Sequence, residues 1–147
     1  MRSPFRLVPV TADDVRAVCD LRVRPDQEGF VAANAVSLAE AQFSPHAWFR
    51  AAYVDDVLVG FVMLHDDPAG TPTLWRLMVD ARFQGRGYGR QVVAQVVDHL
   101  RARSGVSSLA VGARGGAAGP GAFYASLGFV PTGEVLAGDE TVYRLAL

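Results

Sequence analysis

The feature that most constrains the fold is an apolar run, Thr73–Val79, that leads through a glycine-rich loop into an amphipathic stretch. The loop carries Gly85, Gly87 and Gly89 at alternate positions. Over Gly87–Ser104 the apolar residues recur at spacings of three and four, which predicts a helix with one buried face: Val92, Val93, Val96, Val97 and Leu100. A strand that passes through a tight turn into such a helix predicts an α/β fold, with helices packed on a sheet.

The same loop has the chemistry of an anion site. Glycines let the backbone turn tightly and expose consecutive N–H groups, and the positive end of the following helix attracts phosphate. Arg82, Arg86 and Arg90 surround the loop with cationic groups that pair well with phosphate oxygens. A dinucleotide fingerprint does not fit, because Arg90 stands where that motif has its last glycine and the loop comes late in the chain. A turn in which the glycines serve backbone geometry alone remains the simplest alternative.

The rest of the chain predicts a mixed sheet flanked by helices. Thr11 and Asp14 have the spacing of an N-terminal cap, and Ser37 and Glu40 repeat it. The expected elements are a strand at Phe5–Val10, helices at Thr11–Arg22 and Ser37–Phe43, a hairpin of Trp48–Val54 and Val57–His65, a strand at Ser108–Gly112, a helix at Pro120–Leu127, and strands at Phe129–Thr132 and Glu140–Leu147.

Composition excludes several classes of protein. Fourteen basic and fifteen acidic residues give a net charge of −1, which argues against a nucleic-acid binder. The chain contains no lysine, so a Walker-type phosphate loop, a Schiff-base enzyme and a pyridoxal-phosphate enzyme are excluded. Cys19 is the only cysteine and His46, His65 and His99 are scattered, so we expect no metal site. With no apolar run of membrane-spanning length, we expect a cytoplasmic domain.

Two motifs follow one another along the chain. Gln84–Gly89, after the expected strand, has the pattern Q/R-x-x-G-x-G/A, and Phe123–Phe129 has the pattern of a helix with a tyrosine before a Leu-Gly-Phe turn. In this order the two motifs resemble the signatures of the GNAT superfamily of N-acetyltransferases. The resemblance covers nearly the whole chain and implies a single GNAT domain at 1–147. Its implied fold is a mixed, mostly antiparallel central sheet of about seven strands flanked by about four helices.

Within the superfamily, the chain is most similar to bacterial polyamine (spermine/spermidine or diamine) N-acetyltransferases. The residues that carry this likeness are Gln27–Val31, Asn34, Ser37–Glu40, Trp75–Met78 and Pro131–Glu134. The likeness implies acetyl-CoA-dependent acetylation of the primary amine of a small molecule, a polyamine, by direct transfer in a ternary complex. Acetylation of an antibiotic, an amino acid or a protein N-terminus, and an acyl-CoA-binding module without catalysis, remain alternatives. Homodimers are common in the family, so a homodimer is also an expectation.

The resemblance also assigns the cofactor contacts. The main chain of Leu77, Met78 and Val79 pairs with the pantetheine arm of acetyl-CoA, and an N–H group near Val79 polarises the thioester oxygen. The pyrophosphate lies on the loop residues Gln84, Gly85, Arg86, Gly87, Tyr88, Gly89 and Arg90. Many family members have an asparagine seven residues before the tyrosine, where this chain has Ala117, so that side-chain contact is missing. The simpler interpretation of Leu77 and Val79, as core residues, is compatible because the cofactor uses their backbone.

The catalytic assignments are Tyr124 and a carboxylate. Tyr124 is the expected acid for the leaving thiolate, since the pKa of a phenol, about 10, is near that of a thiol. Because alkyl amines are protonated at neutral pH, a carboxylate is expected to accept a proton. Glu28 is the first candidate because the resemblance places it in the segment that lines the acceptor pocket; Glu40 is the second and Glu134 the third. Glu28, Glu40 and Trp75 are the expected acceptor-binding residues, Trp75 through contact with an ammonium; a core position on its strand is the alternative for Trp75. For each carboxylate, a solvated surface charge is the alternative.

Overall fold

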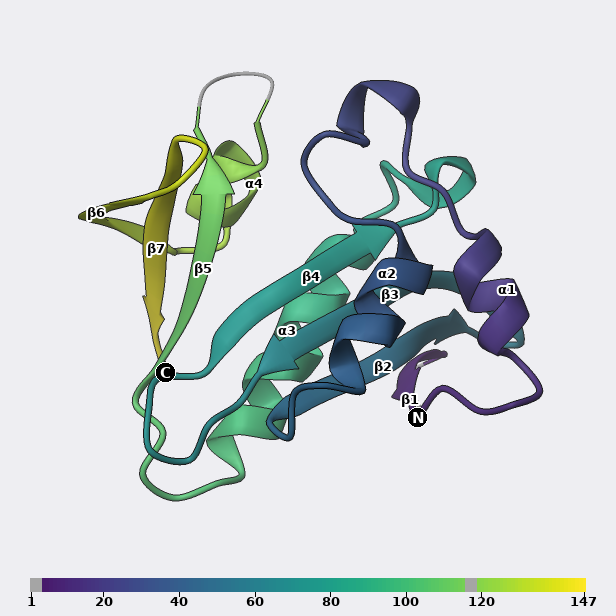
Figure 1. The fold of residues 1–147 in the computed structure, drawn as a ribbon, viewed down its shortest axis with the longest axis horizontal. Coiled ribbons are helices and arrows are strands. Elements are labelled where there is room, and N and C mark those ends of the chain that lie inside the picture. Colours follow the sequence, from purple (N-terminus) through teal and green to yellow (C-terminus); the bar gives the residue numbers. More distant parts are fainter. Residues whose placement is uncertain (1–3, 116–118) are drawn as a thin grey trace.

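The computed structural model describes residues 4–115 and 119–147, which form a seven-stranded sheet flanked by helices (Figure 1). The strands follow the order β1-β2-β3-β4-β5-β7-β6, and among their pairings only β4–β5 is parallel. Their bounds are Phe5–Val8 (β1), Ala47–Val54 (β2), Val57–His65 (β3), Thr73–Val79 (β4), Ser108–Arg114 (β5), Val130–Leu136 (β6) and Glu140–Ala146 (β7). The mixed, mostly antiparallel sheet is therefore confirmed.

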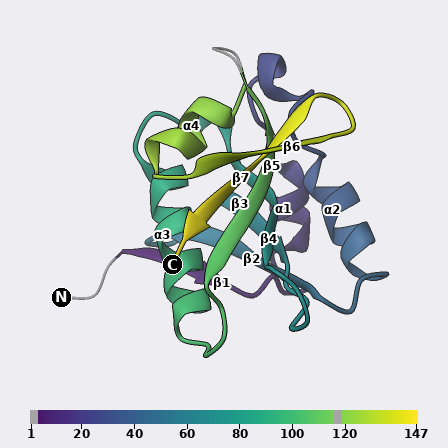
Figure 2. The ribbon, with the colours of Figure 1, turned by 90° about the vertical axis from the view of Figure 1, so that its left-hand side faces the viewer.

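Helices cover both faces of the sheet. Figure 2 shows α1 and α2 on one side of it and α3 and α4 on the other. In the described residues the α-helices are Val15–Asp20 (α1), Asn34–Ala41 (α2), Tyr88–Arg101 (α3) and Gly121–Ser126 (α4), with short 3-10 helices at Pro25–Gln27 (η1) and Ala81–Phe83 (η2). Each face has its own apolar cluster, one against α3 and α4 and the other beneath α1 and α2.

Helix α3 has the buried face that its sequence predicts. The five apolar residues at helical spacing are all buried in the core cluster: Val92, Val93, Val96, Val97 and Leu100. Burial of such a stripe stabilises the helix by about 1.5–3 kcal/mol for each large apolar side chain. The helix therefore holds the glycine loop at its N-terminus in a fixed place on the sheet.

The first helix and its expected cap lie apart. The Thr11 N–H does donate to Asp14 Oδ1 at 2.7 Å, as a capping pair should, but the residues between them form a turn and α1 begins only at Val15. It also ends sooner than expected, because Leu21 is already extended. The expected helix over Thr11–Arg22 is therefore a turn followed by a shorter helix.

The second helix begins earlier than expected. We expected Ser37 to cap it, but α2 starts at Asn34, and Ser37 lies inside the helix with its side chain fully buried. The Asn34 Nδ2 group donates to the Val18 carbonyl of α1 at 2.9 Å. This contact between helices fixes the start of α2 and overrides the local capping pattern.

Strands β4 and β5 separate soon after they meet. Residues Thr73 and Leu74 pair with Ala110 and Val111, and beyond these pairs the two strands diverge (Figure 1). Next to the divergence, β4 has a bulge: Leu64 of β3 faces Leu74 and Met63 faces Arg76, so Trp75 is an extra residue without a partner on β3. A bulge of this kind bends its strand and re-aims the side chain.

Candidate active site

A cleft of about 1090 Å³ occupies the divergence between β4 and β5. Four segments line it: the chain around η1 (Val23–Ala32), strand β4, the glycine loop with the start of α3, and the residues of β5, α4, β6 and β7 that face β4. The expected anion loop and the end of β4, which comes just before it in the chain, therefore line the same cleft. The cleft is large enough to hold a nucleotide-sized ligand.

The edge of β4 that faces the cleft carries main-chain groups without a partner strand. The Asp80 N–H donates to the Val59 carbonyl on β3, and the register pairs Met78 with Phe61 and Leu77 with Val62. Because main-chain groups alternate along a strand, those of Met78 point toward β3 and those of Leu77 and Val79 point away from it, into the cleft. Residues Leu77 and Val79 therefore offer a sheet edge to an extended ligand.

The glycine loop has the backbone geometry that an anion site requires. Gly85 and Gly87 have φ angles of +79° and +81°, in the left-handed region that favours glycine. Gly87 is the N-cap of α3, so the N–H groups of Tyr88, Gly89 and Arg90 belong to the first turn, where an α-helix has no internal acceptors for them. These N–H groups and the helix dipole act together on an anion.

Two loop residues have roles that the sequence did not predict. Gln84 Nε2 donates to the Val79 carbonyl at 2.9 Å and to Gln27 Oε1 at 2.8 Å, so it ties η1 to the end of β4 and leaves the Val79 N–H for a ligand. A Cβ on Gly89 would stand 3.2 Å from Phe123 Cζ, so this glycine allows α3 and α4 to approach. Arg86 is not among the cleft residues, and its guanidinium lies over the ring of Phe83.

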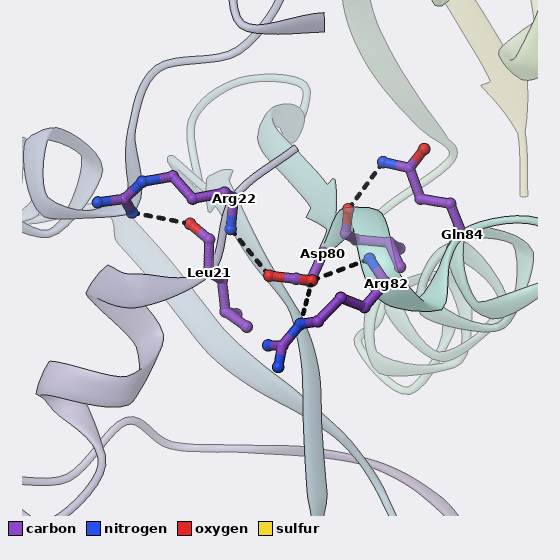
Figure 3. Close-up of polar contacts among 6 residues, drawn as sticks. Leu21, Arg22, Asp80, Arg82 and Gln84 are labelled. Carbon is purple, nitrogen blue, oxygen red and sulfur yellow. Dashed lines mark hydrogen bonds and ion pairs between the residues drawn. The ribbon is translucent and has the colours of Figure 1, made fainter. Parts of the chain in front are cut away.

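A buried carboxylate anchors the chain before η1 to the end of β4. Asp80 accepts hydrogen bonds from the Arg22 N–H at 2.9 Å, the Arg82 N–H at 3.0 Å and Arg82 Nε at 2.8 Å (Figure 3). Burial raises the pKa of the Asp80 carboxyl, but the hydrogen bonds from Arg82 and Arg22 outweigh this and bring the pKa below its ordinary value. Asp80 therefore stays ionised and fixes where the η1 segment leaves the sheet.

Tyr124 reaches the cleft from α4. The residue is 7% exposed, and its ring packs against Phe123 and Phe129, with ring centroids 5.1 and 5.4 Å away. No other residue in 4–115 or 119–147 hydrogen-bonds its hydroxyl, which remains available to a ligand in the cleft. Burial raises the pKa of Tyr124 well above that of a free phenol, so the side chain stays protonated at neutral pH.

The expected acceptor residues divide into two groups. Glu28 and Trp75 line the cleft, on the η1 segment and on the bulge of β4. Glu40 does not line it; its carboxylate pairs with Arg76 at 3.2 Å, and Arg76 is the cleft residue of that pair. Glu134 lies exposed on β6, also outside the cleft lining. The position of Ala117 lies outside the described residues.

The structure adds a carboxylate that the sequence did not indicate. Glu140, the first residue of β7, lines the cleft beside Gly112 of β5. Nothing in the local pattern marks Glu140, because it reaches the cleft through the position of β7 next to β5 in the sheet.

Comparison with known proteins identifies the family. A sequence profile of the Acetyltransferase (GNAT) family matches residues 15–129. The chain belongs to the GNAT family of acetyltransferases. Members of this family use acetyl-CoA, and the described residues contain no group of three His, Cys, Asp or Glu side chains that could hold a metal ion. Within that same part of the chain, no helix is long and apolar enough to cross a membrane.

Among curated relatives, the spermine/spermidine N(1)-acetyltransferase of Bacillus subtilis (strain 168) is 30% identical over 98 residues, which are 62% of this GNAT chain and 64% of that protein. The match thus spans a little under two thirds of the relative. Among solved structures, an acetyltransferase from Thermus thermophilus has a TM-score of 0.74 at 24% identity, over 97% of both chains. The PaiA N-acetyltransferase of Thermoplasma acidophilum, solved with coenzyme A, has a TM-score of 0.71 at 14% identity, over 97% of this chain and 99% of that one.

Proposed function

We propose that this protein transfers the acetyl group of acetyl-CoA to a primary amine of a small molecule, a polyamine, by direct transfer in a ternary complex. The observation that carries the proposal is the open edge of β4, which leads into the N–H groups of the glycine loop and faces the hydroxyl of Tyr124 in one cleft. The name of the Bacillus subtilis relative supports the choice of a polyamine.

The residues present fit acetyl-CoA. Main-chain groups of Leu77 and Val79 are placed to pair with the amides of the pantetheine arm, as a neighbouring strand would. The N–H groups at the start of α3 and the guanidinium of Arg90 are placed to hold the pyrophosphate. When bound, acetyl-CoA supplies the acetyl thioester. Residues of the chain bind and orient the reactants and transfer the protons.

Three groups of the chain act in the reaction: one stabilises the thioester oxygen, one accepts a proton and one donates to the leaving sulfur. A main-chain N–H of β4 near Val79, one that the pantetheine amides leave free, donates to the thioester oxygen and stabilises the negative charge that develops there. Glu28 accepts a proton from the attacking ammonium, directly or through water, so that the neutral amine attacks. Tyr124 donates a proton or a hydrogen bond to the sulfur that leaves. Direct transfer requires no thiol of the protein, and Cys19 lies on α1, away from the residues that line the cleft.

Release of free thiol from acetyl-CoA tests the proposal. The acceptor panel contains spermidine, spermine, 1,4-diaminobutane, amino acids, aminoglycosides and short peptides. We expect rapid thiol release with the polyamines and slow release with the other acceptors. Thiol release confined to another class of acceptor would contradict the choice of polyamine. Tight binding of coenzyme A by calorimetry, with no thiol release for any acceptor, would instead indicate a module that binds acyl-CoA without catalysis.

A further inference from the structure

The cleft carboxylate Glu140 lies on the face of the sheet opposite α3. Val111 and Ala113 of β5 and Tyr143 of β7 belong to the core cluster beneath α3 and α4. Along a strand, successive side chains point to opposite faces of the sheet. Gly112 on β5 and Glu140 on β7 therefore point to the other face. Trp75 packs against the apolar cluster of that same face. Glu140 is therefore on the same side of the sheet as the residues expected to receive the acceptor.

Gly112 makes room for this carboxylate. A Cβ on Gly112 would stand 3.0 Å from Glu140 Oε2 and 3.2 Å from Leu136 Cδ1. A larger residue at this position would push the carboxylate aside. With glycine there, the carboxylate lies against the β5 backbone at the wall of the cleft.

The arginine directly across the ladder does not form an ion pair with Glu140. Arg114 is its direct partner across β5 and β7, a position from which opposite charges commonly pair. The Arg114 guanidinium instead lies 5.8 Å from the centre of the Phe30 ring, which belongs to the η1 side of the cleft. Within the described residues, Glu140 has neither an ion pair nor a side-chain hydrogen bond. Its negative charge is thus free to meet a ligand.

The two sides of the cleft each present a carboxylate. Glu28 comes from the η1 side, and Glu140 comes from the side formed by β5 and β7; Figure 1 shows these segments on either side of the divergence. Trp75, on β4, adds an aromatic surface to the lining of the same cleft. This lining offers a partner for each end of an alkyl chain that carries two cations, whereas a monoamine leaves one carboxylate without a partner.

We infer that Glu140 binds a second, distal ammonium of the acceptor and so selects diamines and polyamines over monoamines of the same length. The inference rests on the proposed function, in which Glu28 serves the amine that is acetylated. Glu140 is a specificity residue in this scheme: it binds the far end of the acceptor and takes no part in proton transfer.

Binding to the protein saturated with coenzyme A tests this inference by calorimetry, with 1,4-diaminobutane and butylamine as probes. A charge-assisted hydrogen bond of about 1.5–3 kcal/mol corresponds to roughly 10- to 100-fold in affinity. We therefore expect the wild type to bind the diamine at least about tenfold more tightly than butylamine. Glu140→Gln should lose this preference and bind butylamine as the wild type does. Asp139→Asn, which removes the exposed carboxylate next to Glu140 outside the cleft lining, is the matched control and should keep the preference.

Equal affinity of the wild type for the two amines would overturn the inference, and so would a Glu140→Gln protein that weakens both amines alike. If Glu140→Gln does not fold, as judged by its thermal melt, Glu140→Asp replaces it and should weaken diamine binding alone. Thiol release is measured separately with both amines. A protein that prefers the diamine in binding but releases no thiol contradicts the proposed function and leaves the role of Glu140 standing. A protein that releases thiol but binds both amines equally supports the proposed function and contradicts the role of Glu140.

Discussion

Replacing Tyr124 by Phe removes one hydroxyl from the cleft and little else. The ring keeps its packing between Phe123 and Phe129. The lost hydroxyl has no hydrogen-bond partner within the described residues, so no buried group of the protein is left unsatisfied. We expect the free energy of unfolding to change by less than about 1 kcal/mol, and the Kd for coenzyme A to stay within about threefold of wild type.

The effect on turnover should be large. General acid catalysis contributes about 10²- to 10⁴-fold, so kcat should fall at least about 100-fold, which corresponds to about 2.7 kcal/mol of transition-state free energy. Because burial raises the pKa of Tyr124, the phenol stays protonated through the neutral and mildly alkaline range. Its ionisation should therefore add no alkaline limb to the pH profile of kcat below about pH 10, and the mutant profile should be lower but similar in shape.

A change of leaving group makes this prediction specific. Thiol release is followed with acetyl-CoA and, separately, with the acetyl thioester of 4-nitrothiophenol, whose thiolate leaves without help from an acid. The ratio of wild-type to mutant rate should be large for acetyl-CoA and close to one for the activated thioester. The reasoning is refuted if the Phe variant turns over acetyl-CoA at nearly the wild-type rate, or if the two thioesters show the same ratio.

Three further predictions concern the residues around the cleft. Glu28→Gln should lower kcat/KM for spermidine about 100-fold at pH 7 but by much less at pH 10, where a sizeable fraction of the amine, not just a trace, is already neutral. A ratio independent of pH would show that Glu28 is not the base. Gly87→Ala puts alanine at a left-handed φ, at a cost of about 1–2 kcal/mol, which the free loop can relieve by shifting. Because coenzyme A must restore the original loop, calorimetry should show about tenfold weaker binding, and unchanged affinity would contradict the anion site. Asp80→Asn should lower the free energy of unfolding by about 1–3 kcal/mol at pH 7. The pKa of Asp80 is depressed in the folded state, so its stabilising contribution is present above the ordinary aspartate pKa and is lost as the pH falls through the folded-state pKa. Urea melts of the wild type and Asp80→Asn should therefore converge in acid. A difference in stability that stays constant with pH would contradict this role of Asp80.

Local patterns in the sequence were enough to predict the sheet, α3 and the glycine loop. The spacing of Val92, Val96 and Leu100 is enough to predict their burial, because residues four positions apart lie on the same face of a helix. The same holds for the hairpin of β2 and β3, where the turn lies between two apolar runs. The expected position of Tyr124 on a short helix is also found, and here the motif, as well as the pattern, pointed to it.

The parts that could not be predicted depend on contacts between distant segments. The start of α2 follows from the bond between Asn34 and the Val18 carbonyl, and no capping pattern announces that contact. Glu40 was expected to meet the acceptor, but a cation on another element, Arg76, pairs with it. Glu140 reaches the cleft only because β7 inserts between β5 and β6, an order that periodicity along one strand cannot reveal.

The central claim is that β4 and the glycine loop bring the thioester sulfur of acetyl-CoA to Tyr124. A crystal structure of the complex with coenzyme A tests it most directly. The account predicts that the pantetheine amides pair with the main chain of Leu77 and Val79, that the pyrophosphate meets the N–H groups at the start of α3, and that the sulfur lies within hydrogen-bond distance of the Tyr124 hydroxyl. Coenzyme A bound with its sulfur away from Tyr124, or outside the cleft between β4 and β5, would contradict it.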